Sequence, residues 1–248
     1  MDFSAREGTH NVKTLQEIID KGQRIVFFGG AGVSTESGIP DFRSADGLYN
    51  QKYAYPPEVI LSDTFFYSKP EEFFKFYREK MIFPNARPNA AHKKLFELEQ
   101  AGKLRGIVTQ NIDGLHRMAG NKLVYELHGT IYENTCLNCG KKYGLDAIMN
   151  SEGVPRCECG GVIKPDVVLY GESLDKYTIM GACREISQAD VLIVAGTSLA
   201  VQPAASFIDY FDGRELVVIN PDATSADERA TLVIRGRVGE TMEKIVVR

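Results

Sequence analysis

The sequence lacks any long apolar run: no stretch approaches the roughly 18 to 20 apolar residues that a membrane-spanning helix needs. The first ten residues, Met1 to His10, also lack the apolar core of a secretion signal. From these two absences we expect a cytoplasmic protein that has no membrane partner.

The sequence also lacks an excess of positive charge. Lys and Arg number 29 against 33 Asp and Glu, which gives a formal net charge of -4 and a pI near 5.7. A protein that binds a polyanion through its overall charge would carry the opposite sign, so we expect no nucleic-acid partner. The 248 residues are 44% hydrophobic and 25% charged, which excludes fibrous and disordered classes.

Cysteine is scarce, yet four of the five cysteines fall close together, at Cys136, Cys139, Cys157 and Cys159. The pattern is C-x2-C, then 17 residues, then C-x-C. Paired cysteines at short spacing are typical of a zinc site, and the alternative is four unrelated buried thiols. Four protein ligands leave no open coordination position, so we expect one structural Zn²⁺.

Short apolar runs rich in β-branched residues alternate with helical patterns, which predicts an α/β fold with a doubly wound, Rossmann-like parallel sheet. Two helices are clear: one follows the apolar stripe from Val12 to Ile19 and ends at Gly22, and the other begins at the cap residue Asn89 and ends before Gly102. The predicted strands are 24–28, 106–109, 123–127, 167–170, 191–195 and 216–219.

Two insertions interrupt this alternation. We expect one domain over 1–248, with a large part built from about 1–48, 85–132 and 165–248. A small zinc-binding module would form from the insertions, at about 49–84 and 133–164.

A glycine-rich turn, Gly29 to Arg43, follows the first predicted strand, where exposed backbone N–H groups could hold a pyrophosphate. The signal is weak on its own, because Thr35 replaces the third glycine of G-x-G-x-x-G and no acidic residue follows at the usual distance. A tight turn without a ligand is the alternative.

Polar residues follow several predicted strands, at the sheet edge where α/β proteins bind ligands. Asn111 and Asp113 could instead cap the next helix. His128 could be an ordinary surface residue, although an imidazole suits a general base at neutral pH. The segment 167–172 could be a buried parallel strand without a functional role.

Taken together, these motifs resemble the sirtuin family of NAD-dependent protein-lysine deacylases, in the form of a bacterial single-domain member. The residues that carry the resemblance occur in the family's order, from about residue 12 to the C-terminus. They are Gly30–Ser34 with Gly38–Arg43, Thr109–His116, Glu126–Gly129, the cysteine pairs, Val167–Glu172, Gly196–Ser198 and Ile219–Asn220.

The resemblance implies the site residues. His128 would be the general base that deprotonates a ribose hydroxyl, and Asn111 would position the ribose and catalytic water. The implied contacts to NAD are Ala31, Thr35, Phe42, Arg43, Gln110, Ile112, Asp113, His128, Thr197, Ser198, Asn220 and Val238. The implied contacts to an acetylated protein or peptide are Val167, Val168, Leu169, Tyr170, Gly171 and Glu172.

The resemblance also implies the reaction. The amide oxygen of acetyl-lysine would displace nicotinamide from NAD, and the 2'-hydroxyl would then attack with the help of His128. Hydrolysis would give free lysine and 2'-O-acetyl-ADP-ribose. We expect a monomer that consumes NAD as a co-substrate.

Members that prefer succinyl or malonyl groups carry Tyr-x-x-Arg where this chain has Phe74-Lys-Phe-Tyr77. An apolar pocket without the Arg cannot pair a carboxylate, so we expect acetyl over succinyl.

Three other functions are possible. A dehydrogenase would share the glycine turn but should show the missing acidic residue. A zinc-ribbon binding module would not need polar residues at the strand ends. Mono-ADP-ribosyl transfer to protein is the nearest rival, because it shares the first chemical step.

Overall fold

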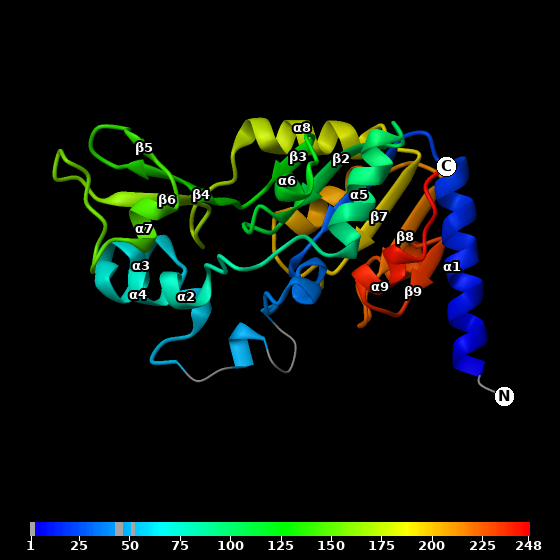
Figure 1. Ribbon diagram of the computed structural model, residues 1–248, viewed down its shortest axis with the longest axis horizontal. Helices are drawn as coiled ribbons and strands as arrows, with labels where there is room; N and C mark the ends of the chain where they lie inside the picture. Colours follow the sequence, from blue (N-terminus) through cyan, green and yellow to red (C-terminus); the bar gives the residue numbers. More distant parts are fainter. Residues whose placement is uncertain (1–2, 43–46, 51–52) are drawn as a thin grey trace.

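The computed structural model describes residues 3–42, 47–50 and 53–248. Its centre is a parallel sheet in the order β3-β2-β1-β7-β8-β9 (Figure 1). Counted along the chain, these strands are the third, second, first, fourth, fifth and sixth of the sheet, which is the Rossmann order. They are β1 Ile25–Gly29, β2 Leu104–Thr109, β3 Val124–Glu126, β7 Val191–Ala195, β8 Glu215–Ile219 and β9 Leu232–Ile234.

Helices cover both faces of this sheet. Successive side chains of a strand point to opposite faces, and those of the central strands are buried on both, so each face needs a covering layer. Phe27 of β1 packs into the cluster that contains Leu15 and Leu95, whereas its neighbour Phe28 packs into the cluster that contains Ile186. The helices on the first face are α1 Phe3–Lys21, α5 Ala90–Gln100 and α9 Val238–Glu243; α8 Lys176–Ser187 and the 3-10 helix η4 Ala204–Tyr210 cover the second. The prediction of a doubly wound α/β fold is confirmed.

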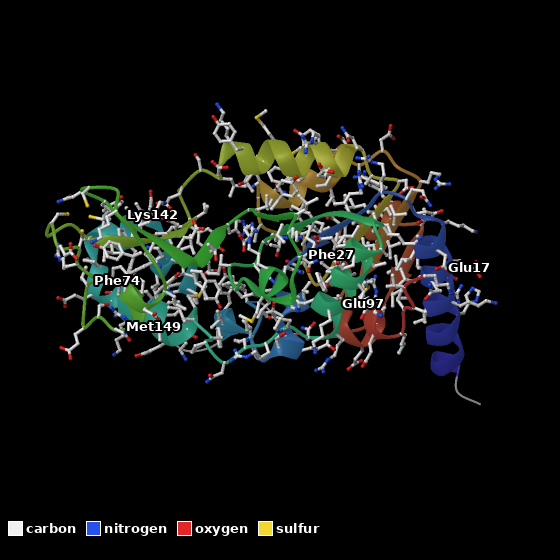
Figure 2. The ribbon with its side chains drawn as sticks, turned by 45° about the horizontal axis from the view of Figure 1, so that its top comes forward. Glu17, Phe27, Phe74, Glu97, Lys142 and Met149 are labelled. Carbon is white, nitrogen blue, oxygen red and sulfur yellow. The ribbon has the colours of Figure 1, made fainter. Side chains whose placement is uncertain are left out.

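A third apolar cluster lies apart from the large sheet and is built largely from aromatic rings, including the fully buried Phe73, Phe74 and Tyr77. Figure 2 shows Phe74 far from Phe27 of the large sheet. A three-stranded sheet in the order β5-β4-β6 packs there with short helices. The elements are α2 Pro57–Ile60, α3 Asp63–Ser68, α4 Pro70–Lys80, β4 Gly129–Cys136, β5 Lys142–Tyr143, α7 Asp146–Met149 and β6 Ile163–Val167.

The predicted parallel strand at 167–170 is wrong. Residues 163–167 form β6 instead, which pairs antiparallel with β4 and not with the large sheet. Burial alternates along β6, with Lys164 and Asp166 on its more exposed side, as expected of an antiparallel strand with one face toward solvent. Residues 168 and 169 belong to no strand, and Tyr170 forms an isolated parallel β-bridge with Ser62.

The short remaining elements connect the sheet to its loops. They are η1 Ala31–Val33, η2 Thr35–Ser37, η3 Leu48–Asn50, α6 Leu115–Ala119 and η5 Asp227–Arg229. Within the described residues, no helix is both long enough and apolar enough to cross a membrane.

Two buried imidazoles meet between α5 and α6. The ring centroids of His92 and His116 are 4.6 Å apart, and neither ring nitrogen of His116 has a hydrogen-bond partner in the described part of the chain. Burial lowers the pKa of His92 to about 4, and burial together with His92 lowers the pKa of His116 well below 6.5. Both rings are therefore neutral in the folded protein at pH 7.

We expect this pair to make the protein sensitive to acid. The unfolded chain takes up these protons near pH 6.5 but the folded chain does not, so the free energy of unfolding falls as pH drops below 6.5. Between pH 7 and pH 5, His92 alone would contribute a loss of about 2 kcal/mol. His116→Gln should flatten the dependence in urea titrations at several pH values. The exposed His10→Gln is the matched control, and equal pH slopes for all three proteins would contradict the prediction.

Candidate active site

The glycine-rich turn meets the end of β7 where the strand order reverses. Gly30 N–H donates to the Ala195 carbonyl (3.2 Å), and Gly32 N–H donates to the Gly196 carbonyl (2.8 Å). A Cβ on Gly32 would lie 2.8 Å from the Gly196 Cα, so only glycine permits this approach. The turn is thereby fixed at the point where doubly wound sheets bind ligands.

Glu36 ties this turn to the last helix. Its carboxylate accepts from the backbone N–H groups of Gly239 (2.6 Å) and Glu240 (3.0 Å) in the first turn of α9. An acidic group is favourable there because the first N–H groups of a helix have no partner within it. Val238, which begins α9, is buried in the core beside the turn.

Ser34 connects two of the predicted site residues. Its hydroxyl donates to Asp113 Oδ2 (2.6 Å) and accepts from Asn111 Nδ2 (3.1 Å). Asp113 Oδ1 also accepts from the N–H of Leu115 (2.9 Å), the first residue of α6, whose N-cap position is occupied by Gly114. Burial raises the pKa of the Asp113 carboxyl, although both hydrogen bonds act to lower it.

Gln110 links the end of β2 to the loop after β7. Its Nε2 donates to Thr197 Oγ1 (3.0 Å), which also accepts from Leu199 N (3.2 Å). Leu199 has a positive φ of 53°, which is uncommon for a residue with a side chain. Such local strain is typical of functional loops, and Ser198 between them is exposed.

His128 lies in the short link between β3 and β4, and its Nδ1 is 2.8 Å from the Gln110 carbonyl oxygen. A carbonyl only accepts, so Nδ1 carries the hydrogen and Nε2 of the neutral ring is free to take a proton. Burial lowers the pKa of His128, and the contact to Gln110 only partly opposes this effect. His128 is therefore a neutral base at physiological pH.

The expected substrate segment runs directly beside this histidine. Val168 N–H donates to the His128 carbonyl (2.9 Å), and Tyr170 N–H donates to the Leu61 carbonyl (2.9 Å). Glu172 fixes the segment to the end of β6, since its carboxylate accepts from Leu169 N (2.9 Å) and from Lys164 Nζ (3.0 Å).

Two tyrosines join Phe42, an expected NAD contact, to this segment. Phe42 packs edge-on against Tyr49, with ring centroids 5.5 Å apart, and the Tyr49 hydroxyl lies 2.7 Å from that of Tyr170. Phe42 and Ile112 both pack against the aromatic cluster of the small sheet. Arg43, another expected NAD contact, lies outside the described residues.

The remaining expected NAD contacts are spread along the same sheet edge. Thr35 is exposed, and its hydroxyl donates to the Gly32 carbonyl (3.0 Å). Asn220 follows β8, and its amide donates to the Asp222 carbonyl (2.9 Å). Direct hydrogen bonds form two groups at this edge. One joins Asn111 and Asp113 through Ser34, whose N–H also donates to the Ala31 carbonyl (3.0 Å), and the other joins His128, Gln110 and Thr197.

Sequence reasoning missed two residues of this arrangement. Ser34 lies inside the glycine-rich motif, but a serine in a turn gives no sign of its contact 79 positions away with Asp113. Glu36 contacts a backbone 203 positions further along the chain, which no local pattern reveals.

The four clustered cysteines meet at one end of the small sheet, with all Sγ atoms within 4.8 Å of one another. Cys136 Sγ is 3.5 Å from Cys159 Sγ, and Cys139 Sγ is 3.6 Å from Cys157 Sγ. Tetrahedral Zn–S bonds of about 2.3 Å would separate the sulfurs by about 3.8 Å. The donor set therefore fits one Zn²⁺ with four protein ligands, which is a structural site.

Known proteins are similar to this chain in both sequence and fold. The model of the Sir2 family matches residues 30–203. NAD-dependent protein deacetylases from Clostridium acetobutylicum and Clostridium perfringens are each 55% identical, over 95% of this chain and 98% of theirs. A Sir2 structure with a p53 peptide and NAD⁺ is 40% identical, covers 94% of this chain and 96% of its own, and has a TM-score of 0.83.

A second Sir2 structure, with deacetylated p53 peptide and 3'-O-acetyl-ADP-ribose, has a TM-score of 0.87, 40% identity and the same coverage. The sheet order, the polar cluster at the switch point and the cysteine site define an NAD-type α/β enzyme with a structural metal module. The chain belongs to the Sir2 family, the sirtuins.

Proposed function

We propose that this chain is an NAD-dependent protein-lysine deacetylase that transfers the acetyl group of acetyl-lysine to ADP-ribose. One observation carries the proposal: His128 is a neutral base with Nδ1 fixed on the Gln110 carbonyl, and its own carbonyl holds the substrate segment at Val168. The 55% identity to bacterial deacetylases over 95% of the chain supports the same reaction. Free NAD supplies the ADP-ribosyl group and is consumed.

The residues of the site divide into three roles. His128 would accept a proton from a ribose hydroxyl through Nε2. Asn111 would position the ribose and a water, while Ser34 holds the Asn111 amide at 3.1 Å. Asp113, whose Oδ2 accepts from Ser34, would still have lone pairs for a carboxamide N–H group.

The other NAD contacts follow the sheet edge. Gln110 would help Asn111 to position the nicotinamide ribose and the catalytic water, Ile112 would line the nicotinamide pocket with Asp113, and Phe42 would shield the reacting carbon. The phosphates and the remaining ribose and adenine would be bound by Ala31, Thr35, Arg43, Thr197, Ser198, Asn220 and Val238. Val238 as a whole residue is 1% exposed, so little of its surface is available to adenine.

The peptide would add to the segment Val167–Glu172 as an extra strand, through backbone hydrogen bonds. Such binding reads the backbone more than the side chains, so specificity would rest on the acylated lysine.

We also propose the division into a large part, about 1–48, 85–132 and 165–248, and a small module from 49–84 and 133–164. A monomeric state and a cytoplasmic location stay predictions.

The choice of acyl group is supported by the residues that replace Tyr-x-x-Arg. Phe74 and Tyr77 are fully buried in the aromatic cluster. The neighbouring Arg78 donates to the Ile148 carbonyl (2.8 Å) and to Ser151 Oγ (2.8 Å), so its guanidinium is already engaged. The side chains at the two motif positions therefore supply no cation to a succinyl carboxylate, and acetyl should be preferred.

Mass spectrometry of an acetyl-lysine peptide and a matched succinyl-lysine peptide tests the proposal, with and without NAD. We expect loss of acetyl only with NAD, equal amounts of nicotinamide and O-acetyl-ADP-ribose, and little loss of succinyl. ADP-ribose attached to protein, with the peptide unchanged, would favour mono-ADP-ribosyl transfer instead. Rapid desuccinylation would contradict the acyl preference.

A further inference from the structure

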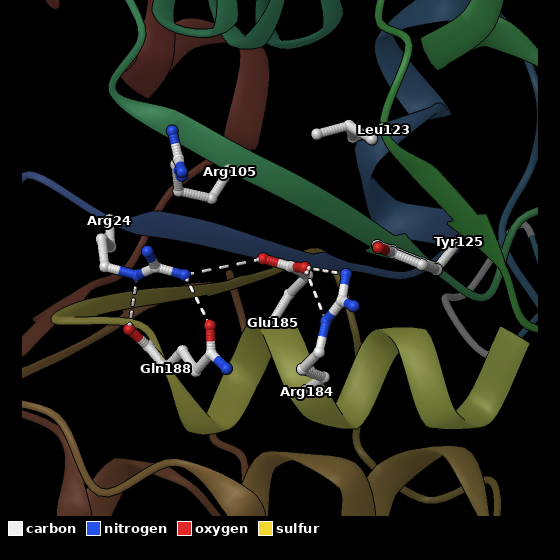
Figure 3. Close-up of a pocket in the computed structure, with 7 residues that line it drawn as sticks. All are labelled: Arg24, Arg105, Leu123, Tyr125, Arg184, Glu185 and Gln188. Carbon is white, nitrogen blue, oxygen red and sulfur yellow. Dashed lines mark hydrogen bonds and ion pairs between the residues drawn. The ribbon is translucent and has the colours of Figure 1, made fainter.

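A pocket of about 450 Å³ lies at the edge of the large sheet opposite the active site (Figure 3). Arg24 stands just before β1, and Arg105 is the second residue of β2, so this pocket is at the amino ends of the strands. The active-site residues Gln110 and Thr197 follow the carboxyl ends. The two sites are therefore separated by the length of the strands.

Positive charge dominates the pocket. Arg24, Arg105 and Arg184 line it together with a single carboxylate, Glu185. The charges of these four side chains sum to +2, in a chain whose formal net charge is -4. A local excess of cations against the overall charge needs a physical reason, and an anionic ligand supplies one.

Two of the arginines are held in place by neighbouring groups. Arg184 Nη2 is 2.8 Å from Glu185 Oε1. Arg24 donates to the Gln188 carbonyl (2.9 Å) and to Gln188 Oε1 (2.8 Å), and its Nη2 is 4.0 Å from Glu185 Oε2. Figure 3 shows both guanidinium groups on either side of the Glu185 carboxylate.

Arg105 differs from the other two arginines. It is exposed, and among the described residues its side chain has no hydrogen-bond or ion-pair partner. Its five N–H donors are available to a ligand, and a guanidinium matches the oxygens of a phosphate in a bidentate manner.

An apolar surface completes the pocket. The ring of Tyr125 lies against two glycines, since a Cβ on Gly106 would be 3.3 Å from it and a Cβ on Gly181 only 2.3 Å. Leu123 beside it is 51% exposed. Figure 3 shows the Tyr125 hydroxyl pointing into the pocket, toward the side of Glu185 and Arg184.

We propose that this arginine pocket, formed by Arg24, Arg105, Arg184, Glu185, Tyr125 and Leu123, is a second binding site that takes the phosphate group of a small molecule. A phosphate monoester carries a charge of about -1.5 to -2 at pH 7, which matches the +2 of the pocket. Free phosphate and a phosphate ester share this chemistry. The exposed Leu123 and the Tyr125 ring would favour an ester with a flat apolar group.

Calorimetric titration with inorganic phosphate and with phenyl phosphate tests the site, at constant ionic strength and with saturating ADP-ribose to occupy the NAD site. We expect one binding event per chain. Arg105→Gln should weaken it about tenfold or more, because a charge-assisted hydrogen bond is lost. Lys75→Gln, which removes one charge from an exposed position of α4, is the matched control and should leave the affinity unchanged.

The two probes distinguish the sources of the phosphate. Tighter binding of phenyl phosphate that Leu123→Ala reduces to the level of inorganic phosphate would identify an ester as the ligand. Equal affinities, both lost in Arg105→Gln, would identify free phosphate. Absence of binding to the wild-type chain, or equal weakening by Arg105→Gln and Lys75→Gln, would overturn the proposal. Arg105 is exposed, so unchanged thermal unfolding should show that its variant is folded.

Discussion

Replacing His128 with alanine should lower kcat/KM for deacetylation about 10²- to 10⁴-fold, the usual contribution of a positioned general base. The first step, loss of nicotinamide, does not need this base in the mechanism that we propose. The variant should therefore still exchange labelled nicotinamide with NAD when acetyl peptide is present. Loss of both activities together would instead indicate that His128 is needed to bind NAD or to keep the site folded.

The pH dependence of the wild-type enzyme provides an independent test. Burial lowers the pKa of His128 from its ordinary value near 6.5, so the neutral base persists as the pH falls. The acidic limb of kcat/KM should thus lie below pH 6.5, and a limb above pH 6.5 would contradict the assignment. Gln110→Ala should keep the same limb, because the backbone carbonyl that holds Nδ1 remains in place.

Removing the zinc ligands should lower both the stability and the activity of the protein. Cys136→Ser should lower the zinc content well below one ion per chain and greatly destabilise the small sheet, because a structural zinc contributes folding free energy directly. Activity should fall at least tenfold as well. β4 runs from Gly129, next to His128, to Cys136, so one strand joins the proposed base to the cysteine cluster.

The fifth cysteine supplies the matched control. Cys183 is half-buried on α8 and is not part of the cluster, so Cys183→Ser should keep the metal, the melting temperature and the activity. Metal analysis, thermal unfolding and the peptide assay measure the three quantities. A Cys136→Ser protein that lacks zinc but keeps the wild-type melting temperature would contradict a structural role.

Much of the large sheet could be predicted because its strands are short apolar runs buried on both faces. β1, β7 and β8 lie within about one residue of the predicted ranges, and Asn89 begins its helix as expected. β4 and β9 were missed. The polar and apolar residues of β4 do not follow the two-residue alternation of a strand, and β9 has only three residues.

The candidate site could be predicted only as a set of motifs. Local patterns identify the residues at strand ends, but they do not say which of them touch. The sequence placed 167–170 in the parallel sheet, whereas the antiparallel pairing of β6 depends on a strand, β4, that was not predicted. Ser34 and Glu36 act through contacts that are distant in the chain, so their roles follow only from the fold.

The position of His128 between two sheets has a mechanical consequence. β3 belongs to the large sheet and ends at Glu126, and β4 belongs to the small sheet and begins at Gly129. A Cβ on Gly129 would lie 2.0 Å from the Asp166 carbonyl oxygen, so this link is tightly packed. A rotation of one sheet against the other about the link would displace the distant cysteine end by the largest amount and the imidazole by the smallest.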